Sequence, residues 1–403
     1  MNKNLNLKSS IGSSYIKKNL YSKDKLKLKK IIHNIKDSID SKKDIFNLLS
    51  NKFDFNFKNP EIIRFNKYKT IILIGMGGSI LGAEAIYSFC KYKIKKNFIF
   101  FDNLDQLKIK EVKKTINLKN SLFIIISKSG NTLETIVNSI LFKEVINNKN
   151  TIIITEKKTN PLNVYAKNKN ILLIDHKSYI GGRYSVLSEV GMIPAYFMGL
   201  KINYFRKKLL NFFNSKENKL IFENIIKVFH IYKYKKIKSI ILLNYAPEID
   251  CFLYWCQQLI AESLGKNGNG ILPVISPAPK DHHSLMQLYL DGPKDKLFYI
   301  FSIKLNEQMK INKNIFGKDF NYIKNKDLSK IKEVQKNSLI KVLKKKNIPY
   351  QEFIINKKDE ETLGELFSWF MIETALVGKL LGLNPFNQPA VEQVKILTKK
   401  HLS

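Results

Sequence analysis

The sequence predicts an α/β protein with two doubly wound parallel-sheet units, preceded and followed by helical extensions. Short apolar runs rich in β-branched residues alternate with stretches of helical periodicity, and this alternation occurs twice along the chain. Continuous apolar strands separated by helices are typical of a parallel sheet that is buried on both faces. The 403 residues, 44% of them hydrophobic, are sufficient for two ordinary domains.

The first unit is expected over residues 56–205, after a helical extension over 1–55 in which Leu and Ile recur among lysines. A helical pattern follows its first strand through SILGAEAIYSF, and another follows its third strand through Asn147. The expected strands are TIILIG (70–75), NFIFFD (97–102), SLFIIIS (121–127), NTIIIT (150–155) and NILLID (170–175).

The second unit is expected over residues 206–403. A lysine-rich helical stretch (201–237) precedes it, and a long helix, LGELFSWFMIETALVGKLLG, follows its last strand. No Pro- or Ser-rich linker separates the units, so we expect them to pack tightly. The expected strands are SIILLN (239–244), GILPVIS (270–276), LFYIFSI (297–303) and EFIIN (352–356).

Composition excludes several classes of protein. No run of about 18 uncharged apolar residues is present, so no membrane span is expected. The N-terminus lacks the apolar core of a secretory signal, and the three cysteines form no C-x-x-C, which favours a reducing, cytoplasmic compartment. The net charge of +35 is carried by dispersed lysines rather than clustered arginines, so specific nucleic-acid binding is not expected.

Two strand ends carry groups suited to a phosphate. Ligands of open parallel sheets bind beyond the carboxyl ends of the strands, where helix N-termini point toward them. The first end, IGMGGS, matches neither the dinucleotide fingerprint nor the P-loop, but its glycines let Ser79 and the backbone approach an anion. A tight strand-to-helix turn without a ligand is the alternative.

The second strand end, SKSGNTLET, is denser in donors. Ser127, Ser129 and Thr132 each offer a hydroxyl before a helix begins. Lys128 adds either positive charge or a contact to the sheet. We interpret this loop as a socket for a phosphate monoester; the alternative is a polar loop capped by its own side chains.

Later segments contain acid–base groups. Arg183 follows two glycines in GGRY, although a surface arginine would fit the same pattern. Glu262 ends the apolar helical stretch WCQQLIAES, where a carboxylate would suit a general base. His282 and His283 are adjacent, and Gln388 and Lys395 lie two helical turns apart, on roughly one face. Without H-E-x-x-H or a similar ligand spacing, no metal site is expected.

Together, in this order, these segments resemble the glucose-6-phosphate isomerase family over about residues 71–395. The matching segments are G-M-G-G-S at Gly75–Ser79, S-K-S-G-N-T-L-E-T at Ser127–Thr135, G-G-R at Gly181–Arg183, E-S-L-G-K at Glu262–Lys266, H-H-S-L-M-Q at His282–Gln287 and N-P-F-N-Q-P-A-V-E-Q-V-K at Asn384–Lys395. The family fold has two sugar-isomerase (SIS) domains, in agreement with the two units expected above.

The resemblance implies an aldose–ketose isomerase of glycolysis and gluconeogenesis, which interconverts glucose 6-phosphate and fructose 6-phosphate through a cis-enediol without a metal or other cofactor. Glu262 would carry the proton between C2 and C1, and Arg183 would stabilise the charge of the intermediate. His283 and Lys395 would assist ring opening. The residues implied for substrate binding are Gly78, Ser79, Ser127, Lys128, Ser129, Thr132, Gly182 and Gln388.

Some alternatives stay open. His282 stands where the family has Gln, so either imidazole is a candidate, although the register with Gln287 favours His283. A relative of the same fold that acts on mannose 6-phosphate or an aminosugar phosphate is a second hypothesis. A noncatalytic sugar-phosphate-binding regulator is a third, but it would not need Glu262, His283 and Lys395. The family also implies a homodimer in which the histidine of each active site comes from the neighbouring subunit.

Overall fold

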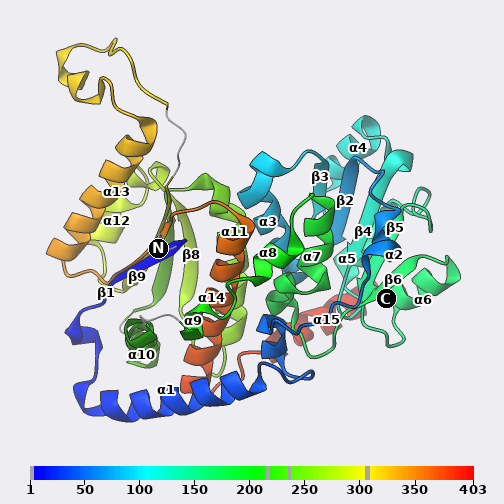
Figure 1. The fold of residues 1–403 in the computed structure, drawn as a ribbon, viewed down its shortest axis with the longest axis horizontal. Helices are drawn as coiled ribbons and strands as arrows, with labels where there is room; N and C mark the ends of the chain where they lie inside the picture. Colours follow the sequence, from blue (N-terminus) through cyan, green and yellow to red (C-terminus); the bar gives the residue numbers. More distant parts are fainter. Residues whose placement is uncertain (1–3, 215–217, 235–236, 305–308) are drawn as a thin grey trace.

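The computed structural model describes residues 4–214, 218–234, 237–304 and 309–403, and its strands form two five-stranded sheets (Figure 1). The first sheet is parallel throughout, in the order β3-β2-β4-β5-β6. Its strands confirm the five expected runs and are β2 (Thr70–Gly75), β3 (Asn97–Phe101), β4 (Ser121–Ile126), β5 (Thr151–Thr155) and β6 (Leu172–Asp175).

Helices follow the first four of these strands, as in a doubly wound sheet. They are α3 (Leu81–Cys90), α4 (Gln106–Thr115), α5 (Leu133–Leu141) and α6 (Pro161–Asn168). The prediction that the helix after β4 continues to Asn147 is wrong, because the chain turns at Phe142. The Phe142 ring is buried there against the rings of Phe101 and Phe123, and this burial stabilises the turn.

The second sheet repeats this topology, in the order β8-β7-β9-β10-β1. The four expected runs are confirmed as β7 (Ser239–Asn244), β8 (Leu272–Pro277), β9 (Lys296–Ile303) and β10 (Tyr350–Ile355). The strand β7 takes the place of β2, β9 that of β4, and β10 that of β5. The main helices of this half are α11 (Asp250–Leu264), α12 (Met286–Asp291), α13 (Leu328–Lys345) and α14 (Glu360–Leu380).

The expectation of a helical segment over residues 1–55 is only partly correct. The helix α1 (Lys18–Ser38) confirms it, but Leu5–Ser10 forms the strand β1, which pairs antiparallel with the edge strand β10. Leu5 and Leu7 point to the same face of the sheet. This alternation of apolar and polar residues is typical of a strand, but it is short and surrounded by lysines, so the sequence analysis missed it. In Figure 1 the chain runs from β1 in the second sheet to α1 beneath it. The domain boundaries at residues 55 and 205 stay predictions.

The lysine-rich stretch between the sheets is helical, as expected. Its helices are α8 (Ile202–Arg206), α9 (Asn211–Asn214) and α10 (Asn218–Tyr234), after α7 (Glu189–Phe197). The remaining helices are α2 (Asn59–Ile63) and α15 (Glu392–Leu402), and short 3₁₀ helices include Gly77–Ser79, Gly182–Leu187 and Lys280–His282.

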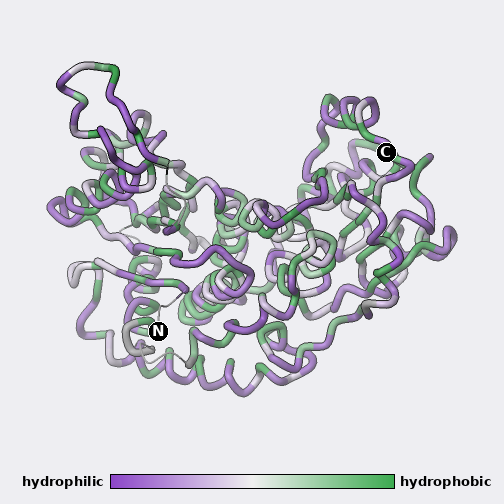
Figure 2. Tube along the Cα trace, turned by 45° about the horizontal axis from the view of Figure 1, so that its top comes forward, coloured by the Kyte–Doolittle hydropathy of each residue, from purple (hydrophilic) through white to green (hydrophobic). Residues whose placement is uncertain are grey.

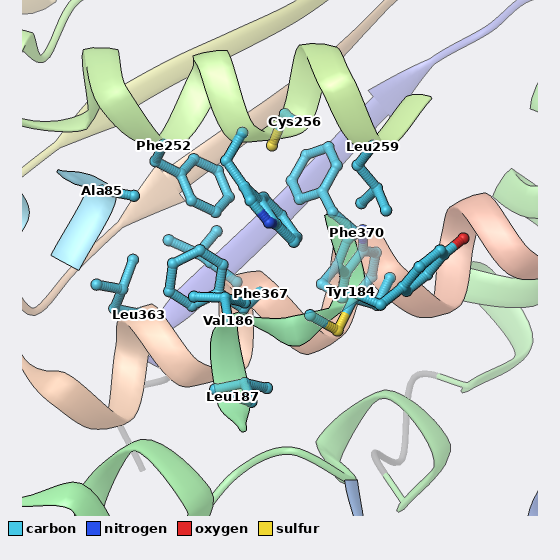
Figure 3. Close-up of a cluster of buried hydrophobic side chains, with 14 of the residues drawn as sticks. Ala85, Tyr184, Val186, Leu187, Phe252, Cys256, Leu259, Leu363, Phe367 and Phe370 are labelled. Carbon is cyan, nitrogen blue, oxygen red and sulfur yellow. The ribbon is translucent and has the colours of Figure 1, made fainter. Parts of the chain in front are cut away.

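A single hydrophobic core joins the two halves. It contains buried side chains from β2 and β4 of the first sheet, β7 and β9 of the second, and the helices between them. Phe252 of α11 meets Phe367 and Phe370 of α14 at ring-centre distances of 5.4 and 5.7 Å (Figure 3). In Figure 2 the hydrophobic residues concentrate along the interior of the trace. The tight packing expected from the missing linker is present.

Within the described ranges, no helix is both long and apolar enough to cross a membrane.

One buried carboxyl group in this core should make stability depend on pH. Glu373 of α14 is buried and accepts hydrogen bonds from the Tyr299 hydroxyl (2.7 Å) and the Trp369 indole (3.2 Å). Desolvation raises the pKa of Glu373 to about 7, and the two hydrogen bonds oppose this only in part. The folded protein therefore holds a proton that the unfolded chain, with a pKa of about 4.3, releases at lower pH.

We predict that Glu373→Gln flattens the fall in stability between about pH 4.5 and 7. Here the unfolded state binds fewer protons, so the wild-type free energy of unfolding should decrease by up to ~1.4 kcal/mol per pH unit from this group. The amide imitates the protonated acid and removes the dependence. Urea unfolding at several pH values checks this, with the exposed Glu392→Gln as control. Parallel curves for wild type and Glu373→Gln would contradict the prediction.

Candidate functional site

The two glycine- and serine-rich segments lie side by side at the carboxyl edge of the first sheet. In the β2–β4 pairing, Gly75 is opposite Ile126, so the turn after β2 and the loop after β4 leave the sheet at the same place. The turn contains Gly77 and the loop contains Gly130, with φ angles of +52° and +68°. A side chain at Gly130 would also collide with Asn160, 1.9 Å from its Oδ1.

The loop after β4 is closed by its own hydroxyl groups. Ser127 Oγ and Thr132 Oγ1 are 2.9 Å apart, and the backbone N–H of Gly130 donates to Ser127 Oγ (3.2 Å). Ser127 is buried, whereas Ser129 and Thr132 are partly exposed. The loop thus has the expected self-capping contacts, and it also presents two accessible hydroxyl-bearing residues beside the N-terminus of α5.

Lys128 was expected either to supply positive charge or to contact the sheet, and the structure shows it bound to other residues of the protein. Its ammonium donates to the backbone carbonyl of Ser178 (2.7 Å) and lies 3.7 Å from Glu156 Oε1. Burial lowers the pKa of Lys128, while the charge of Glu156 opposes that shift. Lys128 therefore ties the loop to the segment that follows β6.

Arg183 connects three distant segments through a buried guanidinium. Its side chain, 1% exposed, starts from the 3₁₀ helix Gly182–Leu187, so the alternative of a surface arginine is wrong. All five N–H groups have acceptors. These are Ser263 Oγ (2.8 Å), Glu262 Oε2 (3.1 Å), Gln388 Oε1 (2.8 Å) and the backbone carbonyls of Pro385 (2.7 Å) and Asn387 (3.0 Å).

Glu262, near the end of α11, is held at both carboxylate oxygens. Oε2 accepts from Arg183, and Oε1 accepts from the side-chain amide of Gln258 (2.9 Å), one helical turn earlier. Its side chain is 32% exposed, so it is accessible from solvent. The expectation of an apolar setting is wrong for the carboxylate itself, because Arg183 and Gln258 are polar partners.

Gln258 is a site residue that the sequence reasoning missed. Its amide nitrogen would lie 2.7 Å from a side-chain carbon at Gly77, so it sits directly against the turn after β2. The i, i+4 spacing of Gln258 and Glu262 places both residues on one face of α11. This spacing is the signal in the sequence that could have identified Gln258 as a site residue.

The turn after β2 also contacts the Arg183 segment. A side-chain carbon at Gly78 would lie 2.2 Å from the carbonyl carbon of Gly182 and 2.4 Å from the backbone nitrogen of Arg183. Only glycine permits this approach. The donor-rich edge of the first sheet and the Arg183–Glu262 pair therefore form one continuous site.

Lys266 follows the helix α11 that carries Glu262, and its ammonium donates to the backbone carbonyl of Asn384. Desolvation and the charge of Arg183 lower the pKa of Lys266 to about 8, against the opposing effect of Glu262. This lysine fixes the chain that leads to Gln388.

The two histidines have different environments. His282 is partly buried, and its Nε2 lies 2.6 Å from the Tyr245 hydroxyl, while desolvation and the charge of His283 lower its pKa. His283 is exposed. No contact between His283 and Glu262 or Arg183 occurs in the part of the chain that the structure describes. The structure thus does not bring His283 into the site of its own chain.

The expectation that Gln388 and Lys395 share one helical face is wrong. Gln388 precedes a 3₁₀ turn and bonds Arg183, whereas Lys395 lies on α15, which begins only at Glu392. The two prolines near Gln388, Pro385 and Pro389, explain why the helix starts late. Lys395 is exposed and pairs with Glu392 (2.7 Å), so within this chain it is outside the site.

Among the residues that the structure describes, no cluster of His, Cys, Asp or Glu has the composition of a metal site. The site offers hydroxyls, a helix N-terminus, a carboxylate and a guanidinium, which suit a phosphorylated polyol.

Comparisons with known proteins agree with this chemistry. The family model described as phosphoglucose isomerase matches residues 59–403. Glucose-6-phosphate isomerase of Methanocaldococcus jannaschii is 33% identical over 338 residues, covering 82% of this chain and 83% of that protein. The enzyme of the same name from Mycoplasmopsis synoviae is 32% identical, with 82% and 81% covered.

Solved structures show the same fold. A hypothetical protein of Thermus thermophilus superposes with a TM-score of 0.85 at 22% identity, covering 99% of this chain and all of that one. A glucose-6-phosphate isomerase of Chlamydia trachomatis has a TM-score of 0.78 at 17% identity, with 99% and 88% covered.

The glycine contact between the two halves of the site can be tested by a pair of substitutions. We predict that Gly78→Ala lowers the free energy of unfolding by about 1–3 kcal/mol or more, because its new carbon must displace backbone atoms of Gly182 and Arg183. Gly182→Ala is the matched control, since nothing lies within 4 Å of a side-chain carbon there. Equal urea midpoints for the two variants would contradict the close approach.

Proposed function

The chain belongs to the phosphoglucose isomerase family, and from this premise we propose how its residues carry out the family's reaction. The activity is the interconversion of glucose 6-phosphate and fructose 6-phosphate, a step of glycolysis and gluconeogenesis. We propose a cytoplasmic location, where those pathways operate.

Glu262 is the base of the reaction. On the ring-opened substrate its carboxylate removes the proton from C2, and the electron pair forms the C1–C2 double bond of a cis-enediol. The same carboxyl group returns the proton to C1, while a hydroxyl proton passes from O2 to O1. The observation that carries this role is the accessible carboxylate held by Arg183 and Gln258. Gln258 acts as a positioning residue.

Arg183 stabilises the negative charge that develops on the enediol oxygens. Its guanidinium is buried, so its field is less screened by water than that of a surface arginine. The N–H that points at Glu262 becomes available to a substrate oxygen when the carboxylate turns toward carbon. Gln388 accepts from the same guanidinium nitrogen and would contact a substrate hydroxyl.

The phosphate is held by the edge of the first sheet. Ser79, Ser127, Ser129 and Thr132 supply hydroxyls, and the backbone around Gly78 and Gly182 and the first turn of α5 supply N–H donors. For Lys128 we propose a supporting role, because its ammonium is occupied by Ser178 and Glu156.

Ring opening requires His283 and Lys395, and we propose that a second subunit brings them to a site. His283 is exposed, whereas His282 is engaged with Tyr245, which favours His283 as the acting imidazole. The helix α15 is exposed along its whole length, with exposed fractions of 68% at Val394 and 72% at Leu402. An apolar helix face of this kind is typical of a surface that another chain covers.

A second exposed apolar segment supports a homodimer. Residues 309–327, which precede α13, project from the body of the molecule (Figure 1), and the Phe320 ring contacts those of Phe316 and Tyr322. Ile315 and Phe316 are 80% and 73% exposed. An isologous dimer would bury such surfaces twice.

Specificity at C2 separates this activity from that of a related isomerase with broader range. The preference for glucose 6-phosphate follows from the family assignment, not from the geometry of the site. A coupled assay with glucose 6-phosphate and mannose 6-phosphate as parallel substrates decides it. We expect turnover of glucose 6-phosphate to exceed that of mannose 6-phosphate.

We predict that Glu262→Gln lowers kcat by roughly 10²- to 10⁴-fold or more, the usual range for a general base. Binding of a sugar-phosphate analogue should change little, because phosphate contacts are unaffected. Exchange of the C2 proton with solvent deuterium should disappear together with turnover. Glu111→Gln, which changes an exposed glutamate of α4, is the control. Activity of Glu262→Gln within threefold of wild type would exclude Glu262 as the base.

We predict that two inactive variants, Glu262→Gln and His283→Ala, complement each other when refolded together. In a mixed dimer with shared sites, one site carries both substitutions and the other carries neither. Random reassembly of equal amounts should restore about a quarter of the wild-type sites, given two-fold symmetry. If mixed dimers form but activity stays at the level of the separately refolded variants, His283 serves its own chain.

A further inference from the structure

The second sheet has a cavity of its own, of about 520 Å³, at the carboxyl ends of β9 and β10. It lies under the first turns of α13 and reaches the segment that follows β7. This volume is in the range of ligand pockets for small molecules. The residues that carry the argument are Lys8, Ser302, Lys332, Lys336 and Glu352, and Tyr245, Glu248, Lys304 and Glu333 also line the cavity.

The position of the cavity corresponds to that of the active site in the first sheet. There the site opens where β2 and β4 end side by side. In the second sheet the equivalent strands are β7 and β9, and Asn244 pairs with Phe301 at their ends. Tyr245 and Ser302, the next residues along the two strands, both line the cavity. The chain continues in opposite directions from such a pair of strands, and ligands bind at these crevices in open α/β sheets.

The wall of the cavity contains the buried ammonium of Lys336. Its side chain is only 7% exposed, and it donates to Glu352 Oε1 (2.5 Å) and Ser302 Oγ (3.1 Å). An ammonium has three donors, so one N–H remains beyond these two bonds. A buried lysine fixed in this way is oriented before any ligand arrives, which lowers the entropy cost of binding.

Other lysines surround the opening. Lys8 of β1 lies 3.7 Å from the second oxygen of Glu352, and Lys332 reaches the backbone carbonyl of Tyr245 only at 3.5 Å, the outer limit of a hydrogen bond. The lining contains four lysines and three glutamates. Glu352 is neutralised by Lys336 and Lys8, and Glu333 is paired with Lys330 outside the cavity (3.0 Å). Glu248 also lies near a lysine outside the cavity, Lys358 (3.8 Å), so positive charge prevails in the lining. The N-terminal end of α13 adds none, because the Asp327 carboxylate caps it by accepting from the backbone N–H of Ser329 (2.8 Å).

We propose that this cavity is a second binding site, specific for a small phosphate monoester, and that it has no catalytic function. Lys332 and Lys336 would hold the phosphate. Glu352 is locked in ion pairs, Glu248 and Glu333 each have a lysine partner, and no arginine lines the cavity as Arg183 lines the first site, so the Arg183–Glu262 arrangement has no counterpart here. The proposal rests on the second sheet alone and does not depend on the isomerase assignment.

Calorimetric titration with inorganic phosphate as the probe, at about 0.2 M KCl to screen the general positive charge, tests the site. Wild type should bind two phosphates per chain. The double variant Ser129→Ala, Thr132→Ala should weaken one of them, and Lys332→Gln should weaken the other by about tenfold or more. Ser302→Ala, which removes a contact of Lys336, should act on the same phosphate as Lys332→Gln. Isomerase activity of Lys332→Gln should stay within about twofold of wild type.

The matched control is Lys341→Gln, which removes the same charge from an exposed position of the same helix, outside the cavity. It should leave both phosphates bound as in wild type. If Lys332→Gln and Lys341→Gln have equal effects, or if the active-site double variant abolishes all saturable binding, the second site does not exist. Titration with acetate separates the ligand classes, and equal affinity for acetate would overturn the specificity for phosphate.

Discussion

The buried guanidinium of Arg183 is the interaction on which the rest of the site depends. It starts from the first half of the chain and binds α11 of the second half and the carbonyls that precede α15. Five acceptors in fixed directions match the planar fork of an arginine and no other side chain. Because the charge is desolvated, every lost acceptor would cost more than at the surface, so the three segments are held in one arrangement.

The backbone around Arg183 is fixed with equal strictness. Its carbonyl accepts from the indole of Trp255 (3.0 Å), whose ring packs against Phe367 in the core between the halves. On the other side, Gly78 touches the peptide that precedes Arg183. The hydrophobic core, the edge proposed to bind phosphate and the carboxylate proposed as the base therefore share one rigid junction. This explains why Glu262 can be oriented closely although its helix and the first sheet are far apart in sequence.

Most of the fold followed from local pattern. Nine buried strands appear as apolar runs because both faces of a parallel sheet are covered, whereas β1 at the antiparallel edge carries only Leu5 and Leu7 among polar residues. For the site, the sequence predicted which residues take part but not which atoms they contact. Whether Lys128 faces a ligand or Ser178 depends on where the segment after β6 runs. Lys395 lies on an exposed helix and would reach a site only through the dimer proposed above. Gln258 was visible only through its spacing from Glu262.

Arginine and lysine have different positions in this protein: two of the arginines are buried, whereas lysine supplies most of the surface charge. The chain carries 69 Lys and Arg residues, yet only three are arginine, and two of these, Arg183 and Arg206, are buried. Arg206 donates to the carbonyls of Leu48 and Ser50, again joining distant segments. A lysine offers three donors from a single nitrogen and cannot span such acceptors. Arginine thus occurs where geometry requires a fork, and lysine supplies charge where position matters less. Two buried lysines of the second half depart from this division. Lys296 bonds Pro293 and Asp295 at the start of β9, and Lys336 is oriented by Glu352 and Ser302 at the carboxyl edge of the sheet.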